Sequence, residues 1–305
     1  MLQQTQVDRV VPYYERFLAA FPTPAACAAA GPAAVVRLWS GLGYNRRALN
    51  LHRAAAAMTA DHDGRVPQED AALRALPGVG PYTARALRAF AFGDDVAAVD
   101  TNGVRVLARA VAGAPLTVRE ATALGDRLVP AGESWEFNQA MFDLGATVCT
   151  AARPSCGQCP LRRQCAWRRR QAATAIDTAI DTATAIDTAT DTATAIDTAT
   201  ATAIDTATAI DPWRSSPTAR PQSTFAGSDR QGRGRLLHAL RQGGVRRSDL
   251  AAACGWPDDA PRAARIAVAV IVEGFAGWSG GKDPVLRLHE RRPDEATPSL
   301  SRPQD

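Results

Sequence analysis

The amino-acid sequence predicts an all-α fold for residues 1–171. Apolar residues recur there at helical spacing, and no segment alternates convincingly as a strand would. Short connections rich in glycine, proline or polar residues separate the apolar runs. We therefore expect helices over residues 4–20, 32–40, 45–61, 69–75, 81–91, 101–112, 117–129 and 134–148.

Two of these helices show the expected core residues most clearly. The apolar residues of the first helix recur at helical spacing, and those of the sixth follow Asn102 in the same way. Such stripes pack in a core more often than they serve function, so we expect both to be buried. They are Val7, Val10, Val11, Tyr14, Phe17 and Leu18 in the first helix, and Val104, Val106, Leu107 and Ala110 in the sixth.

Length and composition restrict the class of protein. A chain of 305 residues has room for one or two domains. It is 46% apolar, but no stretch has the length and purity of a membrane span, and charged residues near the N-terminus replace the apolar core of a signal peptide. We therefore expect a cytoplasmic monomer with no membrane partner.

Charge is spread unevenly along the chain, although the net charge is only +4. Residues 1–171 carry +6, residues 172–211 carry −7 and the remainder carries +5. A basic domain, an acidic connector and a basic tail indicate a nucleic-acid partner, although ordinary solvated charge gives the same balance. Lys282 is the only lysine, so nearly every basic residue is an arginine.

Residues 172–212 separate two parts of the chain. From 173 to 211, threonine or isoleucine alternates strictly with alanine or aspartate, and we expect this low-complexity repeat to be a disordered linker without function. Beyond it we expect a small winged-helix-like module over residues 213–291 and a disordered tail over 292–305. The module's expected helices are Asp229–Arg241, Arg247–Cys254 and Pro261–Glu273, and its expected hairpin joins Phe275–Trp278 to Val285–His289.

Four cysteines lie within seventeen positions, in the pattern C-x6-C-x2-C-x5-C. Thiolates in so compact an arrangement bind either zinc or an iron–sulfur cluster. Zinc sites usually have two separated C-x2-4-C pairs, whereas the longer loops here favour the spaced iron corners of a [4Fe–4S] cluster. We expect the ligands of that cluster to be Cys149, Cys156, Cys159 and Cys165, with zinc as the alternative.

A glycine-rich turn connects two of the expected helices at Leu76-Pro77-Gly78-Val79-Gly80-Pro81. The two glycines allow close backbone approach, and the N–H groups that begin the next helix favour a phosphate oxygen. A helix–hairpin–helix motif grips DNA backbone in this way without reading sequence, although an ordinary turn between helices has the same pattern. About twenty residues later, Asp100 ends an apolar run and opens a helix, a position usual for an N-cap.

Seven features of residues 1–167 occur together in a specific order. They are Met1–Val7, Gly41–Tyr44, Leu76–Thr83, Val99–Asp100, Phe137–Ala140, Asp143–Gly145 and the four cysteines. In this order and spacing they resemble the MutY-type adenine DNA glycosylases of the endonuclease III-like helix–hairpin–helix superfamily. The resemblance implies base excision repair, in which adenine mispaired with 8-oxoguanine or guanine is removed from double-stranded DNA.

The resemblance also implies roles for residues around the reacting sugar. Asp100 would stabilise or capture the oxocarbenium-like sugar as the glycosidic bond breaks. Tyr82 would be the family's pocket tyrosine, and Asn102 a second polar group near the sugar. Gln139 would lie near the flipped adenine. The superfamily's strand-cutting members place a lysine where Tyr82 lies, and residues 1–281 contain no lysine, so we expect no lysine-based lyase step.

A second group of residues would contact the DNA and the base opposite adenine. By the same resemblance, Leu2 and Gln4 fill the space that the extruded base leaves, and three residues stack on or bond the oxidised guanine. Those three are Thr5, Leu42 and Tyr44, while Gln3, Gly78 and Gly80 complete the expected DNA contacts.

Two features depart from the family's pattern. The family's general-acid glutamate lies two residues before the methionine that is Met1 here, so this glutamate and the helix before it lie outside the 305 residues. The residues after the repeat are too few and too helical for the family's Nudix-like domain. We therefore expect this chain by itself to excise little adenine. The alternatives are a catalytically inactive DNA-binding relative and a zinc-stabilised helical DNA-binding protein.

Overall fold

The structure is a computed structural model that describes residues 1–3, 5–174, 211–212, 224–281 and 283–290. The expectations for Gln4, for most of the repeat and for the tail at 292–305 lie outside these described residues. The chain divides into two compact units, one formed by Met1–Val79 with Gln222–Asp305 and the other by Gly80–Pro221.

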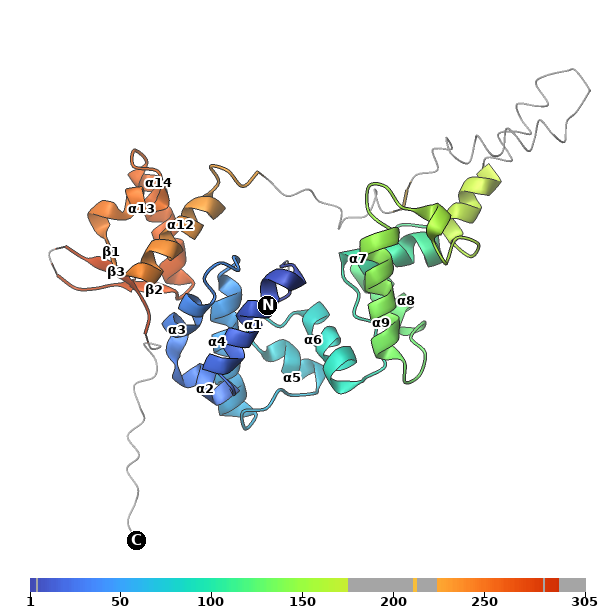
Figure 1. The fold of residues 1–305 in the computed structure, drawn as a ribbon, viewed down its shortest axis with the longest axis horizontal. Helices are drawn as coiled ribbons and strands as arrows, with labels where there is room; N and C mark the ends of the chain where they lie inside the picture. The colour runs from blue at the N-terminus through green and yellow to red at the C-terminus, as the bar shows by residue number, and fades with distance from the viewer. Residues whose placement is uncertain (4, 175–210, 213–223, 282, 291–305) are drawn as a thin grey trace, which may run out of the picture. The chain divides into compact units, whose positions relative to one another are not determined.

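The first unit begins with five helices, labelled in Figure 1. Four of them confirm predicted helices with small shifts at their ends. The fifth, α2, was not predicted, although Thr23 caps it by accepting a hydrogen bond from the N–H of Ala26 at 3.1 Å and Pro24 occupies its first position. The helices are α1 (Val7–Ala20), α2 (Pro24–Ala29), α3 (Gly31–Leu38), α4 (Arg46–Asp61) and α5 (Asp70–Ala75).

The prediction for the core face of α1 was wrong in part. Val10 and Phe17 are buried as expected, but four other apolar residues of the stripe are exposed. One narrow face of α1 packs on the unit, so side chains to either side of that face remain in solvent. The exposed residues are Val7, Val11, Tyr14 and Leu18.

The C-terminal segment of the same unit contains three helices and a three-stranded antiparallel sheet. The three helices and the hairpin expected from the sequence are present, and strand β1 is an addition that two residues could not reveal by alternation. The sheet order is β1-β3-β2, and Ala276 pairs with Leu288. The elements are α12 (Asp229–Gln242), β1 (Val245–Arg246), α13 (Leu250–Cys254), α14 (Ala260–Val272), β2 (Ala276–Trp278) and β3 (Val285–Leu288).

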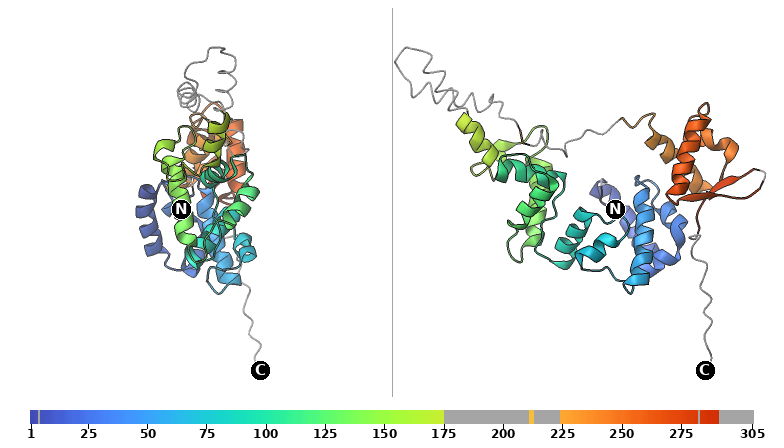
Figure 2. Two further views of the ribbon diagram at one scale, coloured as in Figure 1. Left: turned by 90° about the vertical axis from the view of Figure 1, so that its right-hand side faces the viewer. Right: turned by 180° about the vertical axis from the view of Figure 1, so that it is seen from behind.

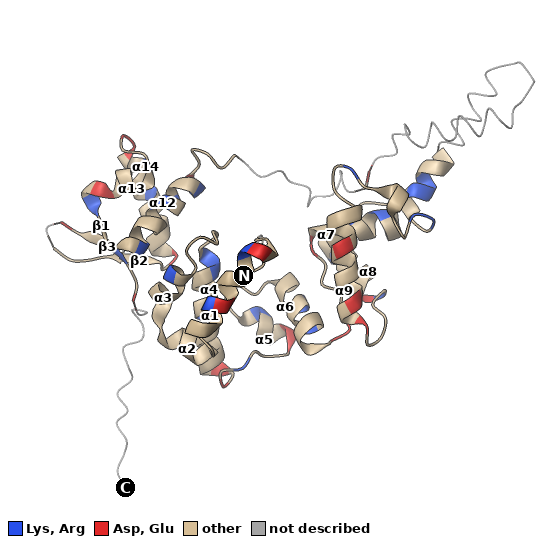
Figure 3. Ribbon diagram, in the orientation of Figure 1, with Lys and Arg blue, Asp and Glu red and all other residues tan. Residues whose placement is uncertain are grey.

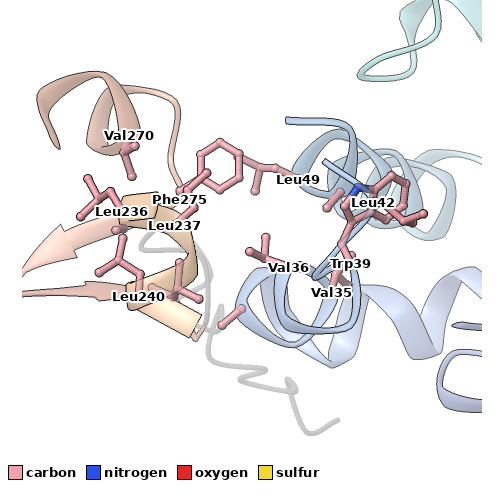
Figure 4. Packing of buried hydrophobic residues seen from close by; sticks show 14 of the residues in the cluster. Val35, Val36, Trp39, Leu42, Leu49, Leu236, Leu237, Leu240, Val270 and Phe275 are labelled. Atoms are coloured by element: carbon pink, nitrogen blue, oxygen red, sulfur yellow. The ribbon is translucent and has the colours of Figure 1, made fainter. Parts of the chain in front are cut away.

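This C-terminal segment shares one hydrophobic core with α3 and α4. Figure 4 shows Val36 and Leu49 facing Leu237 and Phe275 across the contact. The rear view of Figure 2 shows the segment lying beside α3 and α4. Polar contacts join the same elements, because the N–H of Ala33 donates to the carbonyl of His289 at 3.1 Å and Arg37 pairs with Glu290. The C-terminal segment and the first helices therefore fold as one unit.

The second unit is a helical array built around a smaller core. The four helices predicted here are present, and three of them, all except α8, end in a wider π-helical turn. The core centres on Val99, Val104, Leu107 and Met141. Burial is therefore confirmed for Val104, Val106 and Leu107 of the stripe predicted after Asn102, whereas Ala110 is only half-buried. The elements are α6 (Pro81–Leu87) with Arg88–Phe92, α7 (Thr101–Leu107) with Ala108–Ala112, α8 (Val118–Asp126), and α9 (Ser134–Asp143) with Leu144–Val148.

The cysteine loop follows α9 and leads into a helical stretch over 166–174. At the end of the repeat, Asp211 and the following Pro212 belong to the same unit, and Pro212 is buried. Among the described residues, no helix has the length and apolar character needed to cross a membrane.

Candidate active site and cysteine centre

Asp100 lies where a buried extended segment enters a helix. Residues 96–99 are buried, and Asp100 is the N-cap of α7. Its Oδ1 accepts a hydrogen bond from the N–H of Gly103 at 2.7 Å, and its Oδ2 accepts one from Nδ2 of Asn102 at 3.1 Å. The carboxylate therefore caps a helix and is also oriented by a second side chain, which fixes both oxygens.

Asn138 on α9 holds the segment that carries Asp100. Its side chain is fully buried; Oδ1 accepts from the N–H of Ala98 at 2.6 Å, and Nδ2 donates to the carbonyl of Val96 at 2.9 Å. A buried amide that satisfies two backbone groups of an irregular segment fixes its path. Sequence reasoning did not assign this role, although a polar residue on the inner face of a helix was the available signal.

Tyr82 lies in the electrostatic reach of Asp100. Burial and the negative charge of Asp100 both raise the pKa of the Tyr82 phenol above its ordinary value, so the hydroxyl stays protonated at neutral pH. The Tyr82 ring lies 6.5 Å from the ring of Phe142 on α9. On the same helix, Nε2 of Gln139 donates to Oδ1 of Asp143 at 3.1 Å. Asn102 therefore bonds Asp100 directly, Tyr82 lies close enough to feel the charge of Asp100, and Gln139 bonds Asp143 instead.

Arg105 connects the Asp100 neighbourhood to the cysteine loop. Arg105 is only 4% exposed. Its guanidinium donates from Nη2 to Oδ1 of Asn102 at 2.8 Å and from Nε to the carbonyl of Cys149 at 2.7 Å. A third bond reaches the carbonyl of Gly145 at 2.8 Å. The sequence did not single out this arginine, because two of its three acceptors, the carbonyls of Gly145 and Cys149, are far away along the chain.

The four predicted ligands line one cavity in the second unit, which the ring of Trp167 also lines. All four are free thiols, and Cys165 is the most buried of them. Nearby, Arg109 is 1% exposed, donates from Nη1 to Sγ of Cys149 at 3.6 Å and pairs with Asp211. Figure 3 shows further basic residues on the loop and helical stretch that follow.

The four thiols of this cavity are soft donors, which suit either zinc or an iron–sulfur cluster. Among the described residues, no group of three or more cysteine, histidine or carboxylate side chains is arranged to hold a metal ion. Zinc needs its ligand atoms at about 2.0–2.3 Å from one centre, whereas a cluster binds each thiolate at a separate iron. The buried arginines beside Cys149 also suit a site of net negative charge.

In the first unit, Arg47 ties the N-terminal segment to the Gly41–Tyr44 loop. It donates from Nη1 to the carbonyl of Met1 at 2.6 Å and to that of Gln3, and from Nη2 to Oγ1 of Thr5 at 2.9 Å. The same guanidinium lies 5.5 Å from the centre of the Tyr44 ring. Met1, Gln3 and Thr5 are therefore tied to the loop, and the two segments are expected to act on the same DNA.

The loop itself presents one side chain and buries another. Tyr44 is 49% exposed and has a φ of 46°, an uncommon conformation for a residue other than glycine. Leu42 is 4% exposed and belongs to the core of the unit, so its side chain does not face solvent. Leu2, in contrast, is well exposed. Of the two residues of this loop that were predicted to contact the oxidised guanine, Tyr44 is exposed and Leu42 is buried.

The two hairpin glycines differ in their surroundings. Gly78 has a φ of 85°, and a Cβ there would meet Cβ of Asn50 at 2.7 Å, so the folded unit itself requires glycine. Gly80 is the N-cap of α6 with a φ of −90°, and a Cβ there would meet nothing within 4 Å. Packing within the folded unit therefore explains why residue 78 is a glycine, whereas the space around Gly80 would accept a side chain.

With this geometry in view, the comparisons with known proteins are consistent with one another. Residues 1–131 match the family described as HhH-GPD superfamily base excision DNA repair protein. A solved structure of a thermostable thymine-DNA glycosylase is 30% identical with a TM-score of 0.53, over 55% of this chain and 80% of that one. The chain belongs to the HhH-GPD superfamily.

Within this superfamily the chain is similar to proteins named adenine DNA glycosylase. The one from Mycolicibacterium smegmatis is 47% identical over 171 residues, which are 55% of this chain and 58% of that protein. The human one is 41% identical over 176 residues, which are 56% of this chain and 32% of that protein. The chain thus spans less than two thirds of the length of these relatives.

Proposed function

We propose that this HhH-GPD protein removes adenine from mispairs with 8-oxoguanine or guanine in double-stranded DNA. The observation that carries the proposal is the carboxylate of Asp100, oriented by two hydrogen bonds and flanked by Asn102 and Tyr82. The names of its relatives support adenine as the base removed. The match of residues 1–5 and of the Gly41–Tyr44 loop to the MutY pattern supports the mispair as the substrate.

Asp100 would act on the sugar that loses its base. Breaking the C–N bond leaves positive charge on the sugar ring, and an ionised carboxylate beneath it lowers the energy of that state. The bond from Asn102 and the bond from the Gly103 N–H hold the carboxylate in one orientation. Water can then complete the hydrolysis, because no lysine is available in residues 1–281 for a covalent amine intermediate.

The cavity between the four cysteines would hold a [4Fe–4S] cluster. When bound, such a cluster cross-links the loop over residues 149–165 through its four thiolates and contributes folding energy to it. The exposed Arg153, Arg162 and Arg163 would then face DNA phosphates from a loop of fixed shape. The C-terminal segment would be a winged-helix-like module, since its elements follow in the order α12, β1, α13, α14, β2 and β3, with the three strands in one sheet.

The cluster is tested by metal content and colour. We expect about four irons per chain, no stoichiometric zinc and broad absorption near 400 nm. Cys156→Ser should lose the iron and weaken DNA binding, whereas Cys254→Ala, a change at a buried cysteine of the first unit, should keep both. A colourless, zinc-loaded protein with full DNA affinity would favour the zinc-stabilised DNA-binding alternative.

Excision is tested by adding the glutamate that the resemblance places before residue 1. Adenine leaves poorly until a ring nitrogen is protonated, and general-acid help is worth about 10²–10⁴-fold in rate. In single-turnover reactions on an 8-oxoguanine:adenine duplex, we expect little excision by the chain of 305 residues and efficient excision by a chain extended to include the glutamate.

A matched pair of aspartate variants completes the excision test. In the extended chain, Asp100→Asn should abolish excision and preserve binding, whereas Asp94→Asn, at a surface carboxylate paired with Arg88, should change neither. Equal excision with and without the glutamate would refute this mechanism. Binding of the mispair without excision by the extended chain would favour the inactive DNA-binding relative.

A further inference from the structure

The C-terminal module contacts the loop that carries Tyr44 at both of its ends. Arg241, in the last turn of α12, donates from Nε to the carbonyl of Val36 at 3.0 Å and from Nη2 to Oδ1 of Asn45. Val36 lies in α3, and Asn45 is the residue before α4. One guanidinium therefore bridges the base of the loop that joins these two helices.

This contact is part of a larger packed surface. Burial lowers the pKa of Arg241, yet the side chain keeps two acceptors from the opposite segment. On α4, Nη2 of Arg53 donates to the carbonyl of Glu273 at 2.7 Å. At the end of α3, Val36 lies in the same hydrophobic core as Leu237 and Leu240 of the module, as Figure 4 shows. The helices that flank the loop thus rest on the module through both polar and apolar contacts.

Tyr44 needs such support because its backbone is strained. A residue other than glycine with a φ of 46° costs free energy and keeps this conformation only where its surroundings impose it. Arg47 holds the loop toward residues 1–5, and Arg241 holds its base toward the module. Asn45, immediately after Tyr44, makes no capping bond to α4, so its side chain is free to accept from Arg241.

From these contacts we infer that the C-terminal module positions Tyr44 for contact with the base opposite adenine, through the Arg241–Asn45 hydrogen bond. Arg241 is in this view a positioning residue, which acts on DNA recognition through the loop. The inference rests on the proposed function for its consequence, lesion preference, but the positioning itself is a property of the protein alone. The module would influence recognition without being the surface that meets the base.

Amide hydrogen exchange of the DNA-free chain tests the positioning. We compare the unaltered chain with Arg241→Met and with Asn45→Ala, which removes only the acceptor and leaves the Arg241–Val36 bond. In both variants we expect exchange across residues 41–47 to be about tenfold faster, as for the loss of one charge-assisted bond. Arg37→Met is the control, since it removes another arginine of the same interface, paired with Glu290, and should leave exchange across 41–47 unchanged.

Binding tests the consequence with an 8-oxoguanine:adenine duplex, made non-cleavable with a 2′-fluoro-adenosine, against an undamaged duplex. In Arg241→Met and Asn45→Ala, the ratio of affinity for the lesion duplex to affinity for the undamaged duplex should fall about three- to tenfold, with binding of the undamaged duplex unchanged. Arg37→Met should keep the ratio of the unaltered chain. Unchanged exchange in both variants would overturn the inference. If the unaltered chain shows no lesion preference, the proposed specificity fails and exchange alone decides the positioning.

Discussion

The two units hold their functional residues in different ways. In Gly80–Pro221, Asp100 is fixed by fully or nearly fully buried side chains, Asn138 and Arg105, that bond backbone groups. In Met1–Val79, Tyr44 and residues 1–5 are held by Arg47, which is only partly buried, on a loop with a strained backbone. Asp100, which would act on the sugar, is thus held by buried side chains, and residues that would meet the opposite base are tied at a surface.

This difference matches the demands of the proposed chemistry. A carboxylate that stabilises developing charge must be placed before the reaction, since reorganisation would raise the barrier. A side chain that contacts the opposite base must instead remain exposed to the DNA. The predictions below test whether the two units differ in this way, in order of decreasing expected effect.

The largest effect should come from Arg105→Met. The change leaves the carbonyls of Gly145 and Cys149 without this donor and removes the partner of Asn102. Loss of a buried, multiply bonded guanidinium should lower the free energy of unfolding by about 3–5 kcal/mol. Chemical denaturation measures this. Arg46→Met, at an exposed arginine, should lower it by less than about 1 kcal/mol, and equal losses in the two variants would contradict the comparison.

Paired changes at the hairpin glycines should give the next largest effect. Gly78→Ala forces a side chain into Asn50 at a positive φ, so we expect a loss of about 2 kcal/mol in unfolding free energy. Gly80→Ala meets open space and should change stability little, while weakening DNA binding if backbone approaches phosphate there. Denaturation and binding to an undamaged duplex separate the two outcomes. Equal stability of both variants would show that Asn50 yields.

A smaller effect on stability is expected for Arg47→Met. Its acceptors lie partly in solvent and can bond water instead, so the unfolding free energy should fall by only about 1–2 kcal/mol. Hydrogen exchange should nevertheless become faster in residues 1–5 and 41–44. Arg47→Lys keeps the charge but cannot reach all the same acceptors. Compared with Arg47→Met, it should therefore recover more of the unfolding free energy than of the protection of residues 41–44 from hydrogen exchange. If Arg47→Met lowers the unfolding free energy as much as Arg105→Met does, the loop is held as firmly as the buried site around Asp100, and the comparison between the two units fails.

The smallest effect concerns the ionisation of Tyr82. Its pKa is raised first by burial and then by Asp100, so Asp100→Asn should lower it toward, but not to, the ordinary value near 10. Because folding disfavours the phenolate, this group should make the free energy of unfolding fall as pH rises above about 10. Ring-carbon NMR of the four tyrosines follows the titration. An unchanged Tyr82 pKa in Asp100→Asn would show that the two side chains do not interact.

Much of this protein was determined by local sequence. Helical periodicity located nearly all the helices, and the glycine–proline turn and the cysteine spacing marked the hairpin and the cysteine loop. The N-cap position of Asp100 was also readable, since a carboxylate between an apolar run and a helix has few other local roles. These features depend on residues that are close in the chain, so no knowledge of packing is needed.

Tertiary structure decided what those elements do for one another. The apolar residues of α1 have the spacing of a core face, and only packing decides that Val11 and Tyr14 remain in solvent. Packing likewise buries Leu42, which the sequence predicted to contact DNA. The roles of Arg105 and Arg241 were equally hidden, because their acceptors include carbonyls 40 or more residues away. Every residue carries the same backbone carbonyl, so sequence cannot say which one an arginine meets. That choice is made only when distant segments pack together.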